Sequence, residues 1–123
     1  RVLFRSPNGF PPVVLGMDMN AAPPEQSHKY EAEALPTALR HPLKLRSAYA
    51  VANGGVEPAW STWKKRPSGE VRHTIDYILA TPNVEVRRVL LAPDDATVEA
   101  GRLPCFAYPS DHIAIAAEIA VTI

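Results

Sequence analysis

Short apolar runs, separated by turns rich in proline, glycine and asparagine, give this chain a pattern dominated by strands. Residues 12–20 form a continuous apolar run between prolines and polar residues, which predicts a strand buried on both faces. Residues 71–79 are rich in β-formers and predict a second strand, and residues 84–91 predict a third. The alternating run at residues 113–119 predicts a strand near the end of the chain.

Helical segments are fewer and shorter in the same pattern. The polar, alanine-rich stretch after the first strand predicts one helix over residues 24–35, because proline suits a first helical turn and Pro36 breaks the helical pattern. Residues 45–51 predict a short helical turn closed by residues 53–55, Asn-Gly-Gly. Residues 67–69, Pro-Ser-Gly, supply a hairpin turn. The pattern is therefore that of a mixed α/β protein.

Composition narrows the class of protein. The 123 residues suit one modest domain or part of a larger one, and 46% hydrophobic with 21% charged residues is a globular composition. Equal numbers of basic and acidic residues, 13 of each, argue against a broad nucleic-acid-binding surface but allow a local basic patch. Residues 1–4 begin inside an apolar pattern without an initiator methionine, so we expect that element to start before them.

Cysteine usage and hydropathy bear on the compartment. The single cysteine, Cys105, excludes an intrachain disulfide and is compatible with a reducing compartment. Nothing around it predicts an activated thiol, so we expect a small loop or core residue. No apolar run approaches the length of a membrane span, and no membrane partner is expected. We expect an intracellular protein, either cytoplasmic or mitochondrial.

Two polar residues at the end of the first predicted strand are candidates for chemistry. Asp18 and Asn20 are two positions apart, so in an extended chain both project to the same side. Ligands of open α/β sheets bind at that end of the strands. A turn built from two Asx residues, followed by alanines and prolines, is an equally good interpretation, and the two are compatible.

A second candidate site lies in the segment Tyr108-Pro109-Ser110-Asp111-His112, directly before the last predicted strand. Aspartate offers a hard oxygen to a divalent metal or to its bound water, and histidine exchanges protons near neutral pH. On its own, this motif favours a simpler interpretation, a capped turn with a surface histidine. Asp76 belongs to the same question, because a carboxylate within a strand is costly to bury without a partner. His112 is the candidate partner, since His73 faces the other side of the predicted strand.

Residues 60–70 place two tryptophans beside three consecutive cations, Lys64, Lys65 and Arg66. Such a segment attracts phosphate and offers aromatic faces on which a base could stack. The alternative is a solvated hairpin tip with Trp63 packed beneath it. Both interpretations remain open from the sequence.

Four segments of the chain together resemble the C-terminal half of the endonuclease/exonuclease/phosphatase superfamily. They are Asp18-Met19-Asn20, Thr74-Ile75-Asp76-Tyr77-Ile78, Tyr108-Pro109-Ser110-Asp111-His112 and the basic aromatic hairpin of residues 60–70. That superfamily carries Gly-Asp-x-Asn, Asp-Tyr and Ser-Asp-His motifs. Residues 58–64, 68–78 and 103–112 are most similar to the branch of nocturnins and related deadenylases. The resemblance extends over about residues 12–121. Met17 stands where the family has glycine, and the family's N-terminal half, with its metal-binding glutamate, is absent.

The resemblance implies a fold as well as an activity. The expected fold is a two-sheet α/β (α+β) sandwich, of which residues 1–123 would form the C-terminal portion. Half of a sandwich leaves a sheet face and a strand edge uncovered. The N-terminal half of the domain is therefore an expected requirement for function.

The chemistry implied is hydrolysis of a phosphoester by an in-line water with bound Mg²⁺ or Mn²⁺. Asp18 would bind the metal and activate the water, and Asn20 would orient that water and the scissile phosphate. His112 would hydrogen-bond a phosphoryl oxygen or transfer a proton, with its tautomer held by Asp76. Asp111 would contact the metal directly or through water.

Two cations are implied substrate contacts. Arg72, predicted on the same strand face as Asp76, would grip a substrate phosphate, and Lys64 would do the same. The implied substrate is NADP(H), a small molecule that would lose its 2′-phosphate. The alternative is the RNA 3′ end, cleaved by a 3′–5′ poly(A) exoribonuclease. Zero net charge favours the small ligand over a long polyanion. A third possibility is a catalytically incomplete fragment that acts, if at all, in binding.

Overall fold

A computed structural model describes residues 11–23, 40–98 and 100–121 of the chain. The helix predicted over residues 24–35 and the apolar start at residues 1–4 lie outside the described residues. Within these ranges, no helix combines the length and apolar character needed to cross a membrane.

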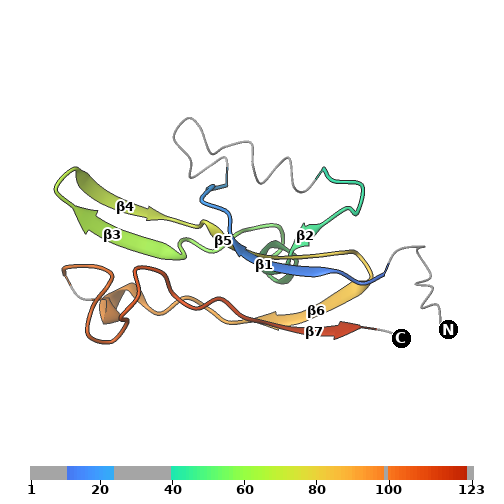
Figure 1. The fold of residues 1–123 in the computed structure, drawn as a ribbon. Coiled ribbons are helices and arrows are strands. Elements are labelled where there is room, and N and C mark those ends of the chain that lie inside the picture. The colour runs from blue at the N-terminus through green and yellow to red at the C-terminus, as the bar shows by residue number, and fades with distance from the viewer. Residues whose placement is uncertain (1–10, 24–39, 99, 122–123) are drawn as a thin grey trace.

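Three small antiparallel sheets make up the described fold (Figure 1). The strands are β1 (Val14–Asp18), β2 (Arg46–Ser47), β3 (Thr62–Arg66), β4 (Gly69–His73), β5 (Asp76–Ala80), β6 (Val84–Val89) and β7 (Ala117–Val121), with the helix α2 (Ala48–Ala52) and the 3-10 turn η1 (Asp95–Thr97). The sheets have the orders β1-β5-β2, β3-β4 and β6-β7. This mixture of helix and strand is consistent with part of an α/β sandwich, as predicted.

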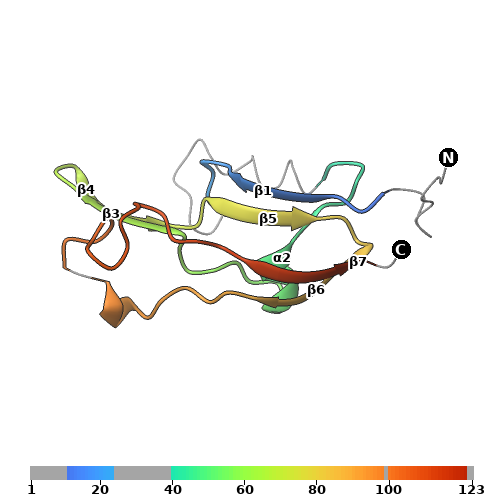
Figure 2. The same cartoon turned by 60° about the horizontal axis from the view of Figure 1, so that its bottom comes forward.

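The sheets lie in a simple arrangement. In both overall views the β6–β7 ribbon runs alongside the β1–β5 pair, while the β3–β4 hairpin extends beyond one end of them (Figures 1 and 2). Helix α2 contacts β5 and β6. Ser47 caps α2 by accepting the Ala50 N–H, and Asn53 closes it, so the predicted helical turn is confirmed although it begins three residues later.

Strand β1 is not buried on both faces, and that prediction was wrong. Val14 and Leu15 are 41% and 37% exposed. Among the described residues, β1 pairs only with β5, so it lies at the edge of its sheet, and one of its faces borders an open groove. A continuous apolar run is expected where a strand is covered on both sides, and the described part of the chain covers only one.

The single strand predicted over residues 71–79 is two strands in different sheets. Strand β4 ends at His73 and pairs with β3, whereas β5 starts at Asp76 and pairs with β1. Side chains satisfy the backbone at the break: the Ser61 hydroxyl accepts the N–H groups of Ile75 and Asp76 at 2.9 and 3.1 Å. The β-formers continue through the break, so the sequence pattern does not reveal it.

Two apolar clusters hold the functional segments in place. The first consists of Leu45, Tyr77 and Leu79, with Met17 packed against it, and it lies on the face of β5 opposite Asp76. The second consists of Trp60, Trp63, Val98 and Leu103, with Tyr108 and Ile113 packed against it. The second cluster supports both the β3–β4 hairpin and the loop that leads to His112.

Candidate active site

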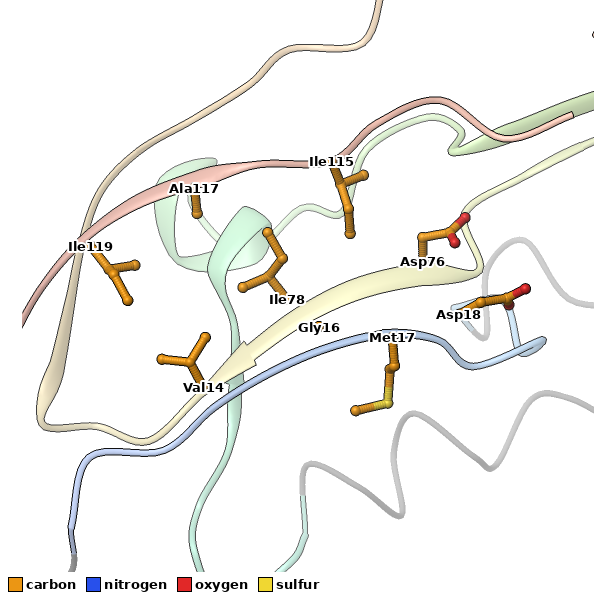
Figure 3. A pocket seen from close by; sticks show the side chains of 9 residues that line it. All are labelled: Val14, Gly16, Met17, Asp18, Asp76, Ile78, Ile115, Ala117 and Ile119. Atoms are coloured by element: carbon orange, nitrogen blue, oxygen red, sulfur yellow. The ribbon is translucent and has the colours of Figure 1, made fainter. Parts of the chain in front are cut away.

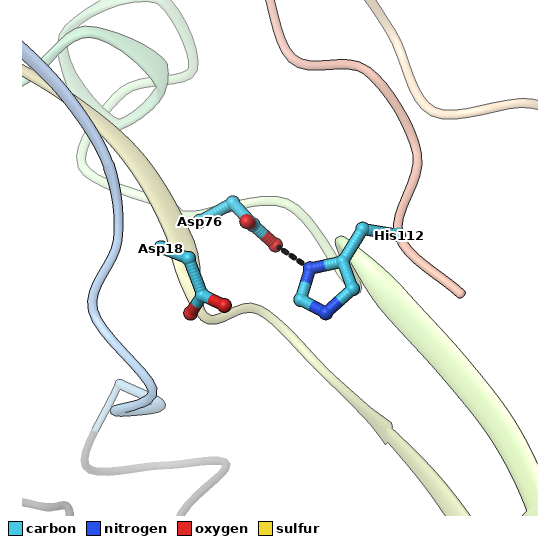
Figure 4. Close-up of side chains that lie close together, drawn as sticks. All are labelled: Asp18, Asp76 and His112. Atoms are coloured by element: carbon cyan, nitrogen blue, oxygen red, sulfur yellow. Dashed lines mark hydrogen bonds and ion pairs between the residues drawn. The ribbon is translucent and has the colours of Figure 1, made fainter. Parts of the chain in front are cut away.

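The structure brings Asp76 and His112 together at the start of β5. The Nδ1 atom of His112 lies 2.8 Å from Oδ2 of Asp76, and the two side chains are 23% and 14% exposed (Figure 4). Backbone contacts from the strand β3 region hold the histidine loop, since Ile113 donates its N–H to the carbonyl of Ser61 at 2.9 Å. The predicted contact between this carboxylate and this imidazole is therefore present.

Asp18 reaches the same place from the neighbouring strand. Asp18 and Asp76 are paired residues in the antiparallel β1–β5 ladder, so their side chains leave the same face of the sheet. One ligand atom from each of Asp18, Asp76 and His112 lies within 4.8 Å of the others (Figure 4). Directly opposed like charges destabilise a sheet unless something offsets them. This pair of carboxylates is therefore a site where a cation would be stabilising.

Asn20 lies beyond the end of β1, in a turn. Strand β1 ends at Asp18, and Asn20 has φ 49°, a left-handed conformation that asparagine tolerates. The N–H of Asn20 donates to Oδ1 of Asp18 at 2.8 Å, so the segment is an Asx turn. The extended chain on which the prediction for Asp18 and Asn20 depended ends at Asp18, so a common direction of the two side chains stays a prediction. The turn interpretation is confirmed.

The turn that carries Asn20 is tied to β5. The N–H of Met19 donates to the carbonyl of Ile75 at 2.8 Å. The hydroxyl of Tyr77 donates to the carbonyl of Ala21 at 2.7 Å, and both residues are almost fully buried. These two bonds hold the end of β1 against the start of β5, where Asp76 lies.

Asp111 and Lys64 form a separate ion pair. Their Oδ2 and Nζ atoms are 2.8 Å apart, and the ammonium of Lys64 holds the pKa of Asp111 below its ordinary value by hydrogen bonding and by charge. The hydroxyl of Thr62 donates to the Asp111 carbonyl at 2.6 Å, which anchors this residue to β3. Asp111 is not a member of the cluster formed by Asp18, Asp76 and His112.

Arg72 lies away from that cluster, contrary to the prediction that it shares a strand face with Asp76. It belongs to β4, and its guanidinium pairs with Asp95 at 2.6 Å. The guanidinium carbon lies 4.3 Å from the ring centroid of Trp63 and 5.9 Å from that of Trp60. The strand break between β4 and β5 accounts for the difference, since the two residues belong to different sheets.

The basic aromatic segment is a packed hairpin rather than a stacking platform. Trp60 and Trp63 are 1% and 7% exposed, and their rings meet edge to face with centroids 5.5 Å apart. Arg102 lies 4.3 Å from the Trp63 ring centroid, as does Arg72, so two guanidinium groups contact this indole. Glu70 accepts hydrogen bonds from Trp63 and Arg102, which lower its pKa. The aromatic faces are therefore not available to a base.

An apolar groove of about 490 Å³ runs from the acidic cluster along the sheet. Its lining comes from β1, β5 and the segment around β7: Val14, Gly16, Met17, Asp18, Asp76, Ile78, Ile115, Ala117 and Ile119. The close-up shows Val14, Ile78, Ile115 and Ile119 directed toward a common space, with the two aspartates at one end (Figure 3). The groove explains why β1 carries an apolar face that the described residues leave open.

One buried residue of the site was missed in the sequence. Ser61 is fully buried, and its hydroxyl donates to Oδ2 of Asp76 at 2.5 Å, the same oxygen that contacts His112. A serine before a strand carries no signal of its own, because serine is common at turns and strand ends. Its importance comes from the fold.

Comparison with known proteins gives the class to which this site belongs. A profile of the Endonuclease/Exonuclease/phosphatase family matches residues 2–112. The match includes Asp18, Asp76 and His112, the residues that converge in the structure. The chain belongs to this family.

The chain is similar to nocturnins and to a plant protein. The chain is 38% identical to human nocturnin over 114 residues, which is 90% of this chain and 25% of that protein. It is 36% identical to Xenopus laevis nocturnin over 107 residues, 85% of this chain and 26% of that protein. It is also 37% identical over 91 residues to carbon catabolite repressor protein 4 homolog 5 of Arabidopsis thaliana, 68% of this chain and 19% of that protein. The chain thus spans about a quarter of the length of these two nocturnins.

Proposed function

We propose that the protein carrying this chain is a metal-dependent phosphoric ester hydrolase. The observation that supports this most is the convergence of Asp18, Asp76 and His112 within 4.8 Å, two of them opposed carboxylates on paired strands. An arrangement that costs stability is kept where it serves binding or catalysis. Membership of a family of nucleases and phosphatases points the same way.

The donor set of the site fits Mg²⁺ or Mn²⁺. Carboxylate oxygens are the protein ligands that these ions prefer, and Asp18 offers an exposed carboxylate. Asp76 is the poorer ligand, because its Oδ2 already receives a hydrogen bond from Ser61 and faces His112. When bound, the ion would neutralise charge on the phosphate and on the attacking oxygen. Asp111 remains a proposed metal contact, and its Oδ2 is paired with Lys64.

The chain's own residues then have distinct proposed roles. Asp18 would position and activate the attacking water, with Asn20 orienting the water and the phosphate. Asp76 would hold the imidazole of His112 in one orientation, as carboxylates do in other His–carboxylate pairs. His112 would then hydrogen-bond a phosphoryl oxygen or transfer a proton. Lys64 would contact a substrate phosphate from the side of Asp111.

The proposed substrate is NADP(H), hydrolysed at its 2′-phosphate to give NAD(H). Support comes from the similarity to the nocturnins and from the zero net charge, which favours a small anion over a polymer. A second candidate is 3′–5′ cleavage of poly(A) RNA, supported by the match to the carbon catabolite repressor homolog. Arg72 contributes to neither proposal while it is paired with Asp95.

The same proposal includes a requirement for the N-terminal half of the domain. The open apolar groove beside β1 and β7 supports it, because exposed contiguous apolar surface is usually covered by a partner. A catalytically incomplete chain is the corresponding alternative for residues 1–123 taken by themselves. We also propose an intracellular location, cytoplasmic or mitochondrial, in keeping with the single cysteine.

The test is phosphate release from NADP(H) with Mg²⁺, by this chain and by the protein translated from its full reading frame. Asp18→Asn and His112→Ala should each lower the rate by about 10²-fold or more. Asp94→Asn is the matched control, since Asp94 also accepts the N–H two residues ahead, at 3.1 Å, but lies outside the cluster. Unchanged rates in both site variants would remove the assignment.

The dependence of substrate affinity on salt concentration distinguishes the two candidate substrates. A polymer that contacts several cations through its phosphates loses affinity steeply as salt rises, whereas a dinucleotide shows a shallow slope. Poly(A) and NADP(H) should therefore be compared over the same range of salt concentration. Activity of the full reading frame but not of residues 1–123 would support the requirement for the N-terminal half.

A further inference from the structure

Ser61 lies at the junction of three functional elements. It directly precedes β3, it contacts the break between β4 and β5, and its carbonyl accepts the N–H of Ile113 beside His112. Its relative exposure is 0%, so water does not compete for its hydroxyl. Everything that this hydroxyl contacts is therefore protein.

The hydrogen-bonding capacity of the Ser61 hydroxyl is fully used. A serine hydroxyl has one proton to donate and two lone pairs to accept with. The N–H groups of Ile75 and Asp76 donate to it at 2.9 and 3.1 Å, which occupies both lone pairs. The single proton is then available only for Oδ2 of Asp76, at 2.5 Å. The direction of the hydroxyl is determined by the backbone at the strand break.

This arrangement constrains His112. Oδ2 of Asp76 accepts the Ser61 proton and lies 2.8 Å from Nδ1 of His112. A carboxylate oxygen can accept from both neighbours, so Nδ1 carries the proton in this contact. In the neutral ring, Nε2 is then the acceptor, and it is the nitrogen not engaged by Asp76.

We infer that Ser61 is a positioning residue for the Asp76–His112 pair. It holds the Asp76 carboxylate in the orientation that keeps the proton on Nδ1 and leaves the lone pair of Nε2 to take up a proton, which is the proton-transfer role proposed for His112. The effect on catalysis rests on the proposed function, but the effect on the tautomer does not. A hydroxyl that served only to satisfy the strand break would leave the tautomer unchanged.

The first test is spectroscopic and compares the wild-type protein with one variant. Nitrogen-15 NMR of histidine-labelled, metal-free protein, at a pH where the ring is neutral, reports which nitrogen of His112 carries the proton. We expect the Nδ1–H form in the wild-type protein and a shift toward Nε2–H, the form usual for free histidine, in Ser61→Ala. An Nε2–H ring in the wild-type protein, or an unchanged Nδ1–H ring in a folded Ser61→Ala variant, would overturn the inference.

The second test is kinetic and uses the protein from the full reading frame. Loss of a group that orients a catalytic side chain typically costs about 10- to 100-fold in activity, and we expect this fall in kcat with little change in KM. Ser61→Thr keeps a hydroxyl and should restore most of the rate if it folds. Ser47→Ala is the matched control, because the buried Ser47 hydroxyl also donates to a carboxylate, that of Glu57, at 2.8 Å, and accepts a backbone N–H, far from the cluster.

The outcomes separate this inference from the proposed function. If the wild-type protein hydrolyses phosphoesters but Ser61→Ala has the same kcat and the same His112 tautomer, the inference fails and the function stands. If no hydrolysis is found, the tautomer alone decides the inference. A fall in kcat of equal size in Ser47→Ala would show a general loss of stability and would also overturn it.

Discussion

The hydroxyl of Tyr77 provides a direct test of how the fold holds the acidic cluster together. Removing it as Tyr77→Phe deletes one oxygen from a side chain that is 1% exposed. That oxygen donates to the carbonyl of Ala21 at 2.7 Å and lies 3.2 Å from the carbonyl of Thr74. The first of these bonds ties the turn after Asp18 to β5, so the substitution loosens the turn without altering any charge.

The expected cost depends on burial. Ala21 is 2% exposed, so its carbonyl has little access to water once the tyrosine hydroxyl is gone. A lost hydrogen bond that leaves a buried acceptor without a partner costs about 1–3 kcal/mol. We expect the free energy of unfolding to fall by about 2 kcal/mol. The slightly better burial of a phenyl ring offsets only a small part of this loss.

Tyr49→Phe is the matched control. The Tyr49 side chain is 4% exposed, its hydroxyl donates to the carbonyl of Leu90 at 2.7 Å, and it accepts the N–H of Ala116 at 3.3 Å. The two variants should therefore lose similar stability in urea unfolding. Hydrogen exchange should separate them, because only Tyr77→Phe should speed exchange in the turn at residues 19–22.

Two results would refute this reasoning. A loss of less than about 0.5 kcal/mol in Tyr77→Phe would mean that the Ala21 carbonyl finds another partner. Equal exchange in the turn for both tyrosine variants would mean that Tyr77 contributes stability without holding the turn. In either case the β1–β5 ladder and the bond from Met19 to Ile75 would hold Asp18 without the Tyr77 hydroxyl.

Other predictions concern pH, packing and metal. Glu70 has a pKa below its ordinary 4.5 because Trp63 and Arg102 donate hydrogen bonds to it. The stability that Glu70 contributes is therefore present above pH 4.5 and is lost as the pH falls through the lower pKa of the folded state. In Glu70→Gln, urea unfolding should show a smaller loss of stability over the same fall in pH. Leu79→Ala, at a residue with 0% exposure, should cost about 2–5 kcal/mol, and a loss under about 1 kcal/mol would contradict the packing described. Mn²⁺ at about 100 times its Kd should stabilise the protein by about 2.7 kcal/mol, reversed by chelation and absent in Asp18→Asn. A metal effect that persists in Asp18→Asn would place the ion elsewhere.

The contact between Asp76 and His112 could be predicted because burial of a carboxylate demands a partner, and His112 was the histidine that met the requirement. The position of Arg72 could not be predicted. The Ser61 hydroxyl accepts the N–H groups of Ile75 and Asp76 where the strand breaks, while the β-forming composition continues through the break. The same limit applies to Asn20, because the composition did not reveal that β1 ends at Asp18 and that Asn20 has a left-handed backbone conformation.

The sequence by itself determined the class of this protein. The features that did so are the run of β-forming segments, the residues Asp18, Asp76 and His112 in that order, and the turns between them. Such features depend on local composition and spacing, which the chain carries wherever it folds. Only the tertiary structure decided that Lys64 pairs with Asp111, that Arg72 joins the tryptophans and that Ser61 completes the Asp76–His112 pair. Those contacts join residues between 9 and 47 positions apart, for instance 64 with 111 and 63 with 72, and their formation depends on which strands pair and where each strand ends.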